Sequence, residues 1–120
     1  MRHDRSLWVH VLVLLGVAVV AATAQAESLS PRQHELVNMV RQDCGSCHGL
    51  TFRGGLGPAL LPEDLHDKPV ESLVATVMMG RPGTAMPGWS PFMTEAEAEW
   101  IVRRLKQGFP PVAQQKESSQ

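Results

Sequence analysis

The sequence predicts an all-α domain of three to four helices wrapped around a bound group. Two observations predict the helices: apolar residues recur at helical spacing in three segments, and two of these segments open with a capping box. No stretch alternates between apolar and polar residues as a half-buried strand does. The third observation predicts the bound group, because the glycine- and proline-rich loops between the segments hold little that could pack alone.

Residues 1–26 have the organisation of a secretory signal peptide. Arg2 and Arg5 precede an apolar run of 16 residues, and Ala24-Gln25-Ala26 forms a small-x-small cleavage pattern. The run is shorter than the roughly 20 residues that a membrane-spanning helix needs. An uncleaved membrane anchor is the alternative. We therefore expect export to the periplasm, cleavage after about Ala26 and no stable membrane insertion of the cleaved protein.

Cleavage would leave a domain at residues 27–112 and a polar tail at residues 113–120, which we expect to be disordered. The whole chain carries 11 basic and 12 acidic side chains, and without Arg2, Asp4 and Arg5 these numbers are 9 and 11. This balance leaves no basic footprint for nucleic acid and predicts no strong steering of a partner by one sign of charge. So small a domain buries a modest core, which a covalently held apolar group would stabilise.

The first helix is expected to begin at Pro31 and to run to Asp43. Ser30 is its N-cap, Pro31 occupies the first helical position, and Gln33 completes a capping box. The buried stripe of this helix consists of Leu36, Val37 and Val40. The helix would therefore deliver Cys44 at its end.

Three further helical segments follow. Residues 62–66 can form one short turn, and residues 69–79 form an amphipathic helix that ends before Gly80. The last helix begins after Thr94, which forms a capping box with Glu97, and it ends before Gly108. The inward-facing residues of the two longer helices are expected to be Val70, Leu73, Val74, Val77, Trp100, Ile101 and Leu105.

The motif Cys44-Gly45-Ser46-Cys47-His48 predicts a covalent attachment site for one haem c. Two thiols separated by two residues can each form a thioether with a haem vinyl group, and the adjoining histidine can bind the iron. A dithiol redox pair would favour a βαβ context, and a zinc site needs four ligands, but the chain has two cysteines and scattered further histidines. A disulfide would leave His48 unexplained. Export to an oxidising compartment favours the haem site.

The loop after the motif contains Gly57-Pro58. A metal-binding histidine usually donates its second ring N–H to a carbonyl, which fixes its tautomer. The carbonyl of Pro58 could accept this hydrogen bond from His48. The alternative is that Pro58 only stiffens the turn, and the sequence alone leaves both interpretations open.

Met86 is the first candidate for the second axial ligand of the iron. It lies in a loop rich in proline and glycine, and Pro87 favours an extended backbone at Met86, which lets its thioether reach over a flat ring. The prolines also reduce the freedom of the loop before folding. The alternatives are Met78 and Met79, at the end of a helix where methionine more often fills a core, and then His66.

These features together resemble class I cytochrome c. The likeness covers residues 30–109 and rests on the first helix, the attachment motif, Gly57-Pro58, the Met86-Pro87 loop and the closing helix with Trp100. It implies that the first and last helices cross and that residues 27–112 are a cytochrome c domain. The site residues that it implies are Cys44 and Cys47 as thioether attachments, His48 and Met86 as axial ligands, and Pro58 as the carbonyl partner of His48.

Two segments, residues 47–58 and 80–87, are similar to the small c55X cytochromes, which are encoded beside cd1-type nitrite reductase in denitrifying bacteria. The resemblance implies a periplasmic one-electron carrier and not an enzyme. Its partners would be cd1-type nitrite reductase and an upstream periplasmic or membrane electron donor. No nucleophile–base arrangement, phosphate loop or carboxylate pair in the sequence indicates hydrolytic chemistry.

Two other functions stay open. The protein could be an accessory factor in the maturation of the d1 haem, in which a specific complex matters more than electron delivery. It could also be a sensor or enzyme whose iron has an open sixth position.

For the electron carrier, we expect the porphyrin to be shielded, and its ferrous form favoured, by Leu56, Leu60, Val74, Val77 and Leu105.

Overall fold

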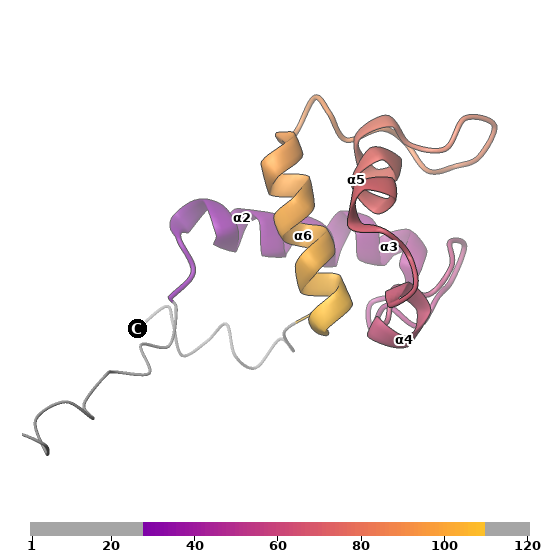
Figure 1. The fold of residues 1–120 in the computed structure, drawn as a ribbon, viewed down its shortest axis with the longest axis horizontal. Coiled ribbons are helices and arrows are strands. Elements are labelled where there is room, and N and C mark those ends of the chain that lie inside the picture. Colours follow the sequence, from indigo (N-terminus) through magenta and orange to yellow (C-terminus); the bar gives the residue numbers. More distant parts are fainter. Residues whose placement is uncertain (1–27, 110–120) are drawn as a thin grey trace, which may run out of the picture.

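The computed structural model describes residues 28–109. The expected signal peptide and the expected polar tail lie outside the described residues, as do residues 27 and 110–112 of the expected domain. The helical elements in chain order are α2 (Pro31–Met39), the π-helix η1 (Val40–Cys44), α3 (Gly45–His48), α4 (Pro62–Leu65), α5 (Val70–Met79) and α6 (Glu95–Gln107) (Figure 1). Between residues 28 and 109 there is no strand. The expected all-α fold is therefore confirmed.

The first helix begins as the sequence predicts but does not end at Asp43. The Ser30 hydroxyl accepts a hydrogen bond from the Gln33 amide, and the Gln33 side chain accepts one from the Ser30 amide. The helical path then continues through η1 and α3 as far as His48, and it ends where Gly49 adopts φ 87°. No proline interrupts residues 32–48, so nothing stops the helix at Asp43. The attachment motif thus lies inside the helical path.

Helix α6 begins and ends as expected, and α5 ends as expected but begins at Val70, one residue after the predicted start. Pro69 precedes α5, and Gly80, with φ 69°, follows it. At the start of α6 the Thr94 hydroxyl accepts from the Glu97 amide, and the Glu97 carboxylate accepts from the Thr94 amide at 2.7 Å. Gly108, with φ 92°, ends α6. Local capping chemistry therefore determines both ends of α6.

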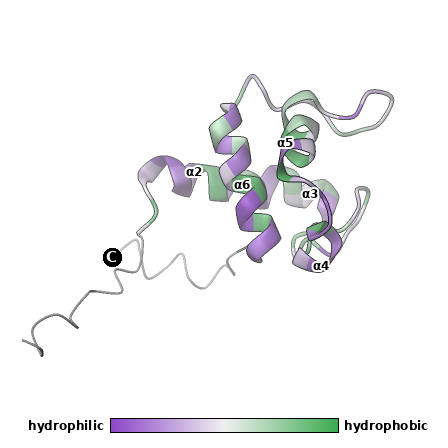
Figure 2. Cartoon of the chain, in the orientation of Figure 1, coloured by the Kyte–Doolittle hydropathy of each residue, from purple (hydrophilic) through white to green (hydrophobic). Residues whose placement is uncertain are grey.

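Helix α6 is the centre of the fold. It contacts α5, α4 and α2, and Figure 1 shows it crossing α2, as the resemblance to cytochrome c implied. Hydrophobic and hydrophilic residues alternate along the ribbon of α6 (Figure 2). Its buried residues are Ala98, Ile101, Val102 and Leu105. Trp100 is only half-buried and lies under the guanidinium of Arg104, 5.3 Å from the ring centroid.

An ion pair joins the N-terminal ends of α2 and α6. The Arg32 guanidinium donates to the Glu97 carboxylate at 2.6 Å, to Glu35 at 2.9 Å and to the carbonyl of Phe92 at 3.1 Å. Glu97 is also the residue that completes the capping box of α6. The start of the first helix is thereby bonded directly to the cap of the last helix.

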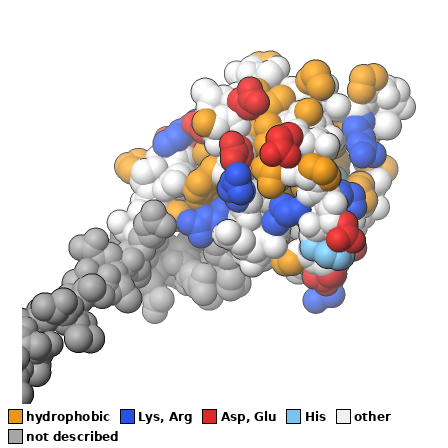
Figure 3. Space-filling model, viewed as in Figure 1, with side chains coloured by type: hydrophobic (Ala, Val, Ile, Leu, Met, Phe, Trp, Pro, Cys, Tyr) orange, Lys and Arg blue, Asp and Glu red, His pale blue; other side chains and the backbone are white. Residues whose placement is uncertain are grey.

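Acidic and basic side chains are mixed over the face drawn in Figure 3 and are not gathered by sign. None of the helices in the described part of the chain has the length and apolar character needed to cross a membrane.

Candidate functional site

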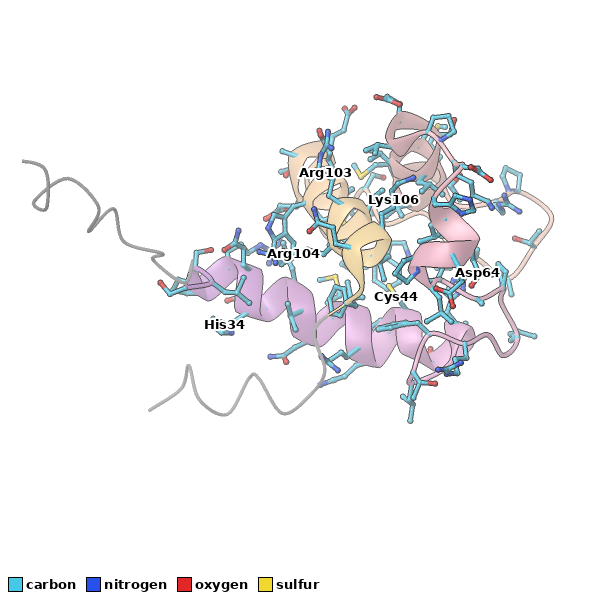
Figure 4. The ribbon with its side chains drawn as sticks, turned by 60° about the horizontal axis from the view of Figure 1, so that its bottom comes forward. His34, Cys44, Asp64, Arg103, Arg104 and Lys106 are labelled. Atoms are coloured by element: carbon cyan, nitrogen blue, oxygen red, sulfur yellow. The ribbon has the colours of Figure 1, made fainter. Side chains whose placement is uncertain are left out.

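A cavity of about 520 Å³ is lined by residues of both long loops and of every helical element except α2. It is lined by Cys44, Cys47 and His48 from the first helical path, by Pro58, and by Met86 from the loop before α6. Figure 4 shows Cys44 and Asp64, which both line the cavity, on the first helical path and on α4. Much of the remaining lining is apolar and includes Leu60, Leu65, Leu73, Val77, Ile101 and Leu105. The volume lies in the range of cofactor pockets.

His48 is buried beside this cavity with a fixed ring. Its side chain is 8% exposed, and Nδ1 lies 2.7 Å from the carbonyl oxygen of Pro58. Because a carbonyl oxygen can only accept, Nδ1 is the donor of this hydrogen bond, and Nε2 is the ring nitrogen left free of it. Gly57 closes against the ring, since a Cβ atom there would lie 2.8 Å from Cε1 and Nδ1 of His48. The arrangement fixes the ring through Nδ1 and leaves Nε2 as the nitrogen that could bind a metal.

The histidine loop, which we define as residues 49–61, folds back onto the attachment motif. The amide of Gly54 donates to the His48 carbonyl at 2.8 Å, and the amide of Gly57 donates to the Cys47 carbonyl at 2.9 Å. Gly49 and Gly54 come so close that a Cβ on Gly49 would be 2.7 Å from the Gly54 oxygen. These main-chain contacts place Pro58 next to the histidine that lies 10 positions earlier.

Phe52 anchors the same loop to the end of the domain. It is 7% exposed and its ring meets that of Phe109 edge-on, with centroids 5.5 Å apart. Its φ of 58° is unusual for a bulky residue. The Leu60 amide donates to the Phe52 carbonyl at 2.9 Å, so the strained residue is bonded within the loop that it anchors.

Cys44 and Cys47 are not joined in a disulfide, and both are half-buried at the cavity. Burial, followed by the neighbouring Asp43 carboxylate, raises the pKa of the Cys44 thiol to about 11. Within residues 28–109, no group of three His, Cys, Asp or Glu residues is placed to hold a metal ion. The donor set at the cavity (two thiols, one imidazole and one thioether) fits a covalently attached haem.

Met86 lines the cavity from the methionine loop, which we define as residues 80–93. Its side chain is half-buried, whereas that of Met79 is 74% exposed. Met78 packs against the core and does not line the cavity. His66 is exposed, and its ring bonds to the Glu63 carbonyl at 2.7 Å and to Asp67 at 3.0 Å.

Sequence reasoning did not identify three features of the site. Met93 is 7% exposed and also lines the cavity. Gly57 touches the ring of His48, a contact that the sequence did not indicate although Gly57-Pro58 was noted there. The Thr84 hydroxyl bonds within the methionine loop, and its position two residues before Met86 in a proline–glycine turn is a signal for such a bond.

Leu56, expected to shield the porphyrin, lines the cavity with its side chain 80% exposed.

The model of the family described as cytochrome C oxidase, cbb3-type, subunit III matches residues 31–103. This range begins at the first residue of α2 and ends within α6, so it includes the attachment motif and both loops of the cavity.

Individual relatives and solved structures are similar over most of the domain. Cytochrome c55X of Pseudomonas aeruginosa is 50% identical over 105 residues, which are 88% of this chain and 87% of that protein. The structure of the c-type cytochrome NirC is 56% identical with a TM-score of 0.66, and the match covers 68% of this chain and 95% of that one. The structure of dihydro-heme d1 dehydrogenase NirN in complex with DHE is 36% identical with a TM-score of 0.55, covering 62% of this chain and 16% of that one.

The helical fold, the attachment motif and the apolar cavity define a c-type cytochrome, and such proteins carry electrons on a covalently bound haem c. Within that class the chain belongs to the cytochrome c55X family.

Proposed function

We propose that this protein is a periplasmic one-electron carrier that holds one haem through Cys44 and Cys47, with His48 and Met86 as the axial ligands. The observation that carries the proposal is the cavity that all four side chains line. The ferric–ferrous couple of the bound haem would supply the electron-transfer chemistry. A thioether ligand raises the reduction potential above that of a site with two imidazoles.

The chain's own residues prepare the site in three ways. The Pro58 carbonyl accepts the hydrogen bond from Nδ1 of His48, so Nε2 is the ring nitrogen that would bind the iron. Main-chain hydrogen bonds within the two loops fix where His48 and Met86 lie. The apolar lining excludes water and so disfavours the more highly charged ferric form. We assign a catalytic role to none of these residues, since each one binds, orients or shields.

The axial assignment is tested by absorption spectroscopy of the exported, haem-loaded protein. We expect the weak far-red band of methionine–ferric iron in the parent protein and its loss in Met86→Ala, together with a lower reduction potential. Met79→Ala is the matched control, because Met79 is exposed and lies off the cavity. A high-spin spectrum of the parent protein, with rapid binding of carbon monoxide, would instead establish an open sixth position and favour a sensor or enzyme.

We further propose that the physiological electron acceptor is a cd1-type nitrite reductase, with an upstream periplasmic or membrane protein as donor. The 50% identity to cytochrome c55X supports this partner. The test mixes the reduced cytochrome with preformed nitrite reductase and follows cytochrome oxidation on addition of nitrite. Rapid oxidation supports the proposal, and oxidation no faster than without the reductase contradicts it.

Mass spectrometry of the exported protein tests cleavage after Ala26.

The likeness to dihydro-heme d1 dehydrogenase favours a second candidate, an accessory role in d1-haem maturation. That solved structure is 36% identical to this chain over 62% of its length. Deletion of the gene separates the two candidates. A maturation factor predicts a fall in d1-haem content, whereas an electron carrier for the reductase predicts normal d1 content and slower nitrite turnover.

A further inference from the structure

The methionine loop is held firmly at its base. Gly80 and Gly88 cross so closely that a Cβ on Gly80 would lie 2.6 Å from the Gly88 nitrogen. Beyond the crossing, the amide of Trp89 donates to the Val77 carbonyl at 3.0 Å, and the amide of Ser90 donates to the Met78 carbonyl at 3.2 Å. These contacts fix both ends of the loop to the end of α5, but none of them reaches its tip.

The tip, residues 81–87, begins with a tight turn. The Thr84 amide donates to the Arg81 carbonyl at 3.0 Å, and Gly83 adopts φ 78°. Proline followed by glycine at the two central positions suits a type II turn. The turn shapes the chain as far as Thr84, but Met86 lies beyond it and needs other contacts to hold its main chain.

One hydroxyl group supplies such a contact. Thr84 Oγ1 donates to the Arg81 carbonyl at 2.7 Å and accepts a hydrogen bond from the Met86 amide at 3.3 Å. The Met86 carbonyl in turn accepts from the Arg81 amide at 3.1 Å. Both main-chain polar groups of Met86 are therefore bonded inside the loop, one of them through the threonine side chain.

We propose that Thr84 is a positioning residue whose hydroxyl clasps the tip of the methionine loop and so holds Met86 at the cavity. Its effect on iron chemistry rests on the proposed function, in which Met86 is the axial ligand. The clasp itself is independent of that ligand role, because it consists of hydrogen bonds between Thr84, Arg81 and Met86.

The clasp matters because the tip is exposed and has few other restraints. Thr84, Ala85 and Pro87 are exposed, and Pro87 has no amide hydrogen to donate. Loss of the hydroxyl removes two exposed hydrogen bonds, which predicts that opening of the tip becomes about tenfold more frequent. The thioether of Met86 would then leave the iron more often, although its own side chain is unchanged.

The test compares Thr84→Val with Thr84→Ser in the haem-loaded protein. Valine keeps the branched shape and removes the hydroxyl, whereas serine keeps the hydroxyl. Thr51→Val is the matched control, because it removes an exposed threonine hydroxyl from the histidine loop. Two quantities are measured: amide hydrogen exchange of Met86 by NMR in the ferrous state, and the rate at which carbon monoxide replaces the sixth ligand.

We expect Thr84→Val to accelerate both quantities about tenfold. Thr84→Ser and Thr51→Val should leave them close to the parent values. Unchanged exchange of the Met86 amide in Thr84→Val overturns the clasp, whatever the ligand of the iron is. If exchange of the Met86 amide is faster in Thr84→Val but the parent protein lacks the far-red methionine band, the clasp is supported and Met86 is rejected as ligand. The two failures are therefore distinguishable.

Discussion

The histidine loop and the methionine loop both deliver a side chain to one cavity, but they are held in different ways. The hydrogen bonds of the histidine loop return to the attachment motif, through the carbonyls of Cys47 and His48, and His48 is 8% exposed. The methionine loop is bonded to α5 only at its base, and its tip bonds to itself. His48 is therefore fixed by contacts with residues close to it in the sequence. Met86 instead depends on the close approach of Gly80 and Gly88 and on the side chain of Thr84.

The largest effect is expected where the two ends of the methionine loop cross. Gly80→Ala places a Cβ 2.6 Å from main-chain atoms and imposes φ 69° on alanine. We expect the free energy of unfolding to fall by about 3 kcal/mol, from overpacking and backbone strain together. Urea unfolding followed by circular dichroism measures the change.

Gly83→Ala separates the two causes of that loss. Gly83 has a similar φ of 78°, but a Cβ there would have no heavy atom within 4 Å. Backbone strain alone should therefore cost about 1 kcal/mol. If Gly80→Ala and Gly83→Ala lowered the free energy of unfolding equally, the contact between Gly80 and Gly88 would not be tight. The base of the loop would then be held no more firmly than its tip.

The next effect tests the histidine loop. Gly57→Ala puts a Cβ 2.8 Å from the ring of His48, which must shift against its hydrogen bond to Pro58. We expect a loss of about 2 kcal/mol in the free energy of unfolding, measured by urea titration. A ring that moves freely would show almost no loss, and His48 would then not be fixed by its loop.

Gly45→Ala is the control for Gly57→Ala inside the same region. A Cβ at Gly45 would meet its nearest neighbours at 3.7 Å, and the residue has a helical φ of −61°. Alanine should therefore stabilise the helical path by about 0.5 kcal/mol. If Gly57→Ala lowers the free energy of unfolding while Gly45→Ala raises it, the loss in Gly57→Ala is due to the clash with the His48 ring.

A smaller effect is expected where α4 meets α6. The Lys106 ammonium donates to the carbonyls of Leu65 at 2.6 Å, His66 at 3.1 Å and Lys68 at 2.6 Å. Lysine near a helix end can bond the last carbonyls in this way, so Lys106→Met should lower the free energy of unfolding by about 1 kcal/mol. The control is Lys68→Met, because the Lys68 ammonium donates to a carbonyl at 2.7 Å only once, to Asp64. Equal losses in the two variants would show that the three bonds act no better than one.

Much of the fold was predictable because its signals are local. Both capping boxes and the glycines at the ends of α5 and α6 involve residues at most three positions apart, and each was confirmed. The end of the first helix was wrongly placed at Asp43, because the π-turn of η1 leaves no signature in residue type. The positive φ of Phe52 was equally invisible, since the tertiary contact with Phe109 supports it.

The candidate site was predictable to a different extent in each loop. The residues chosen from the motif and from the proline–glycine loop all line one cavity, and their ligand roles stay predictions. The sequence could not show that Gly57 touches the His48 ring, because this contact depends on how the histidine loop folds back. It also gave no sign that Met93 lines the cavity, since that follows from how the methionine loop meets α6.

The smallest effect comes from a contact remote from both loop tips, and it depends on pH. The Arg32 guanidinium, followed by the Thr94 amide, lowers the pKa of the Glu97 carboxyl from 4.5 to about 2. A carboxyl whose pKa is lower in the folded state contributes stability above its unfolded value and loses it as pH falls towards the folded value. Stability should therefore decline between about pH 4.5 and about pH 2, and Glu97→Gln should make this decline shallower. The measurement is the midpoint of urea unfolding across that pH range.

Glu99→Gln is the matched control, because Glu99 pairs at 2.6 Å with Arg103 of its own helix and not with a second helix. Exposed pairs of this kind contribute little, so we expect that replacement to leave the acid decline unchanged. The Glu97 contact joins α2 to α6 without touching either loop tip, so Glu97→Gln should also leave hydrogen exchange at Met86 unchanged. A change there would mean that the tip of the methionine loop senses the packing of the terminal helices. The loop would then be held by the whole domain, and its contrast with the histidine loop would be one of degree.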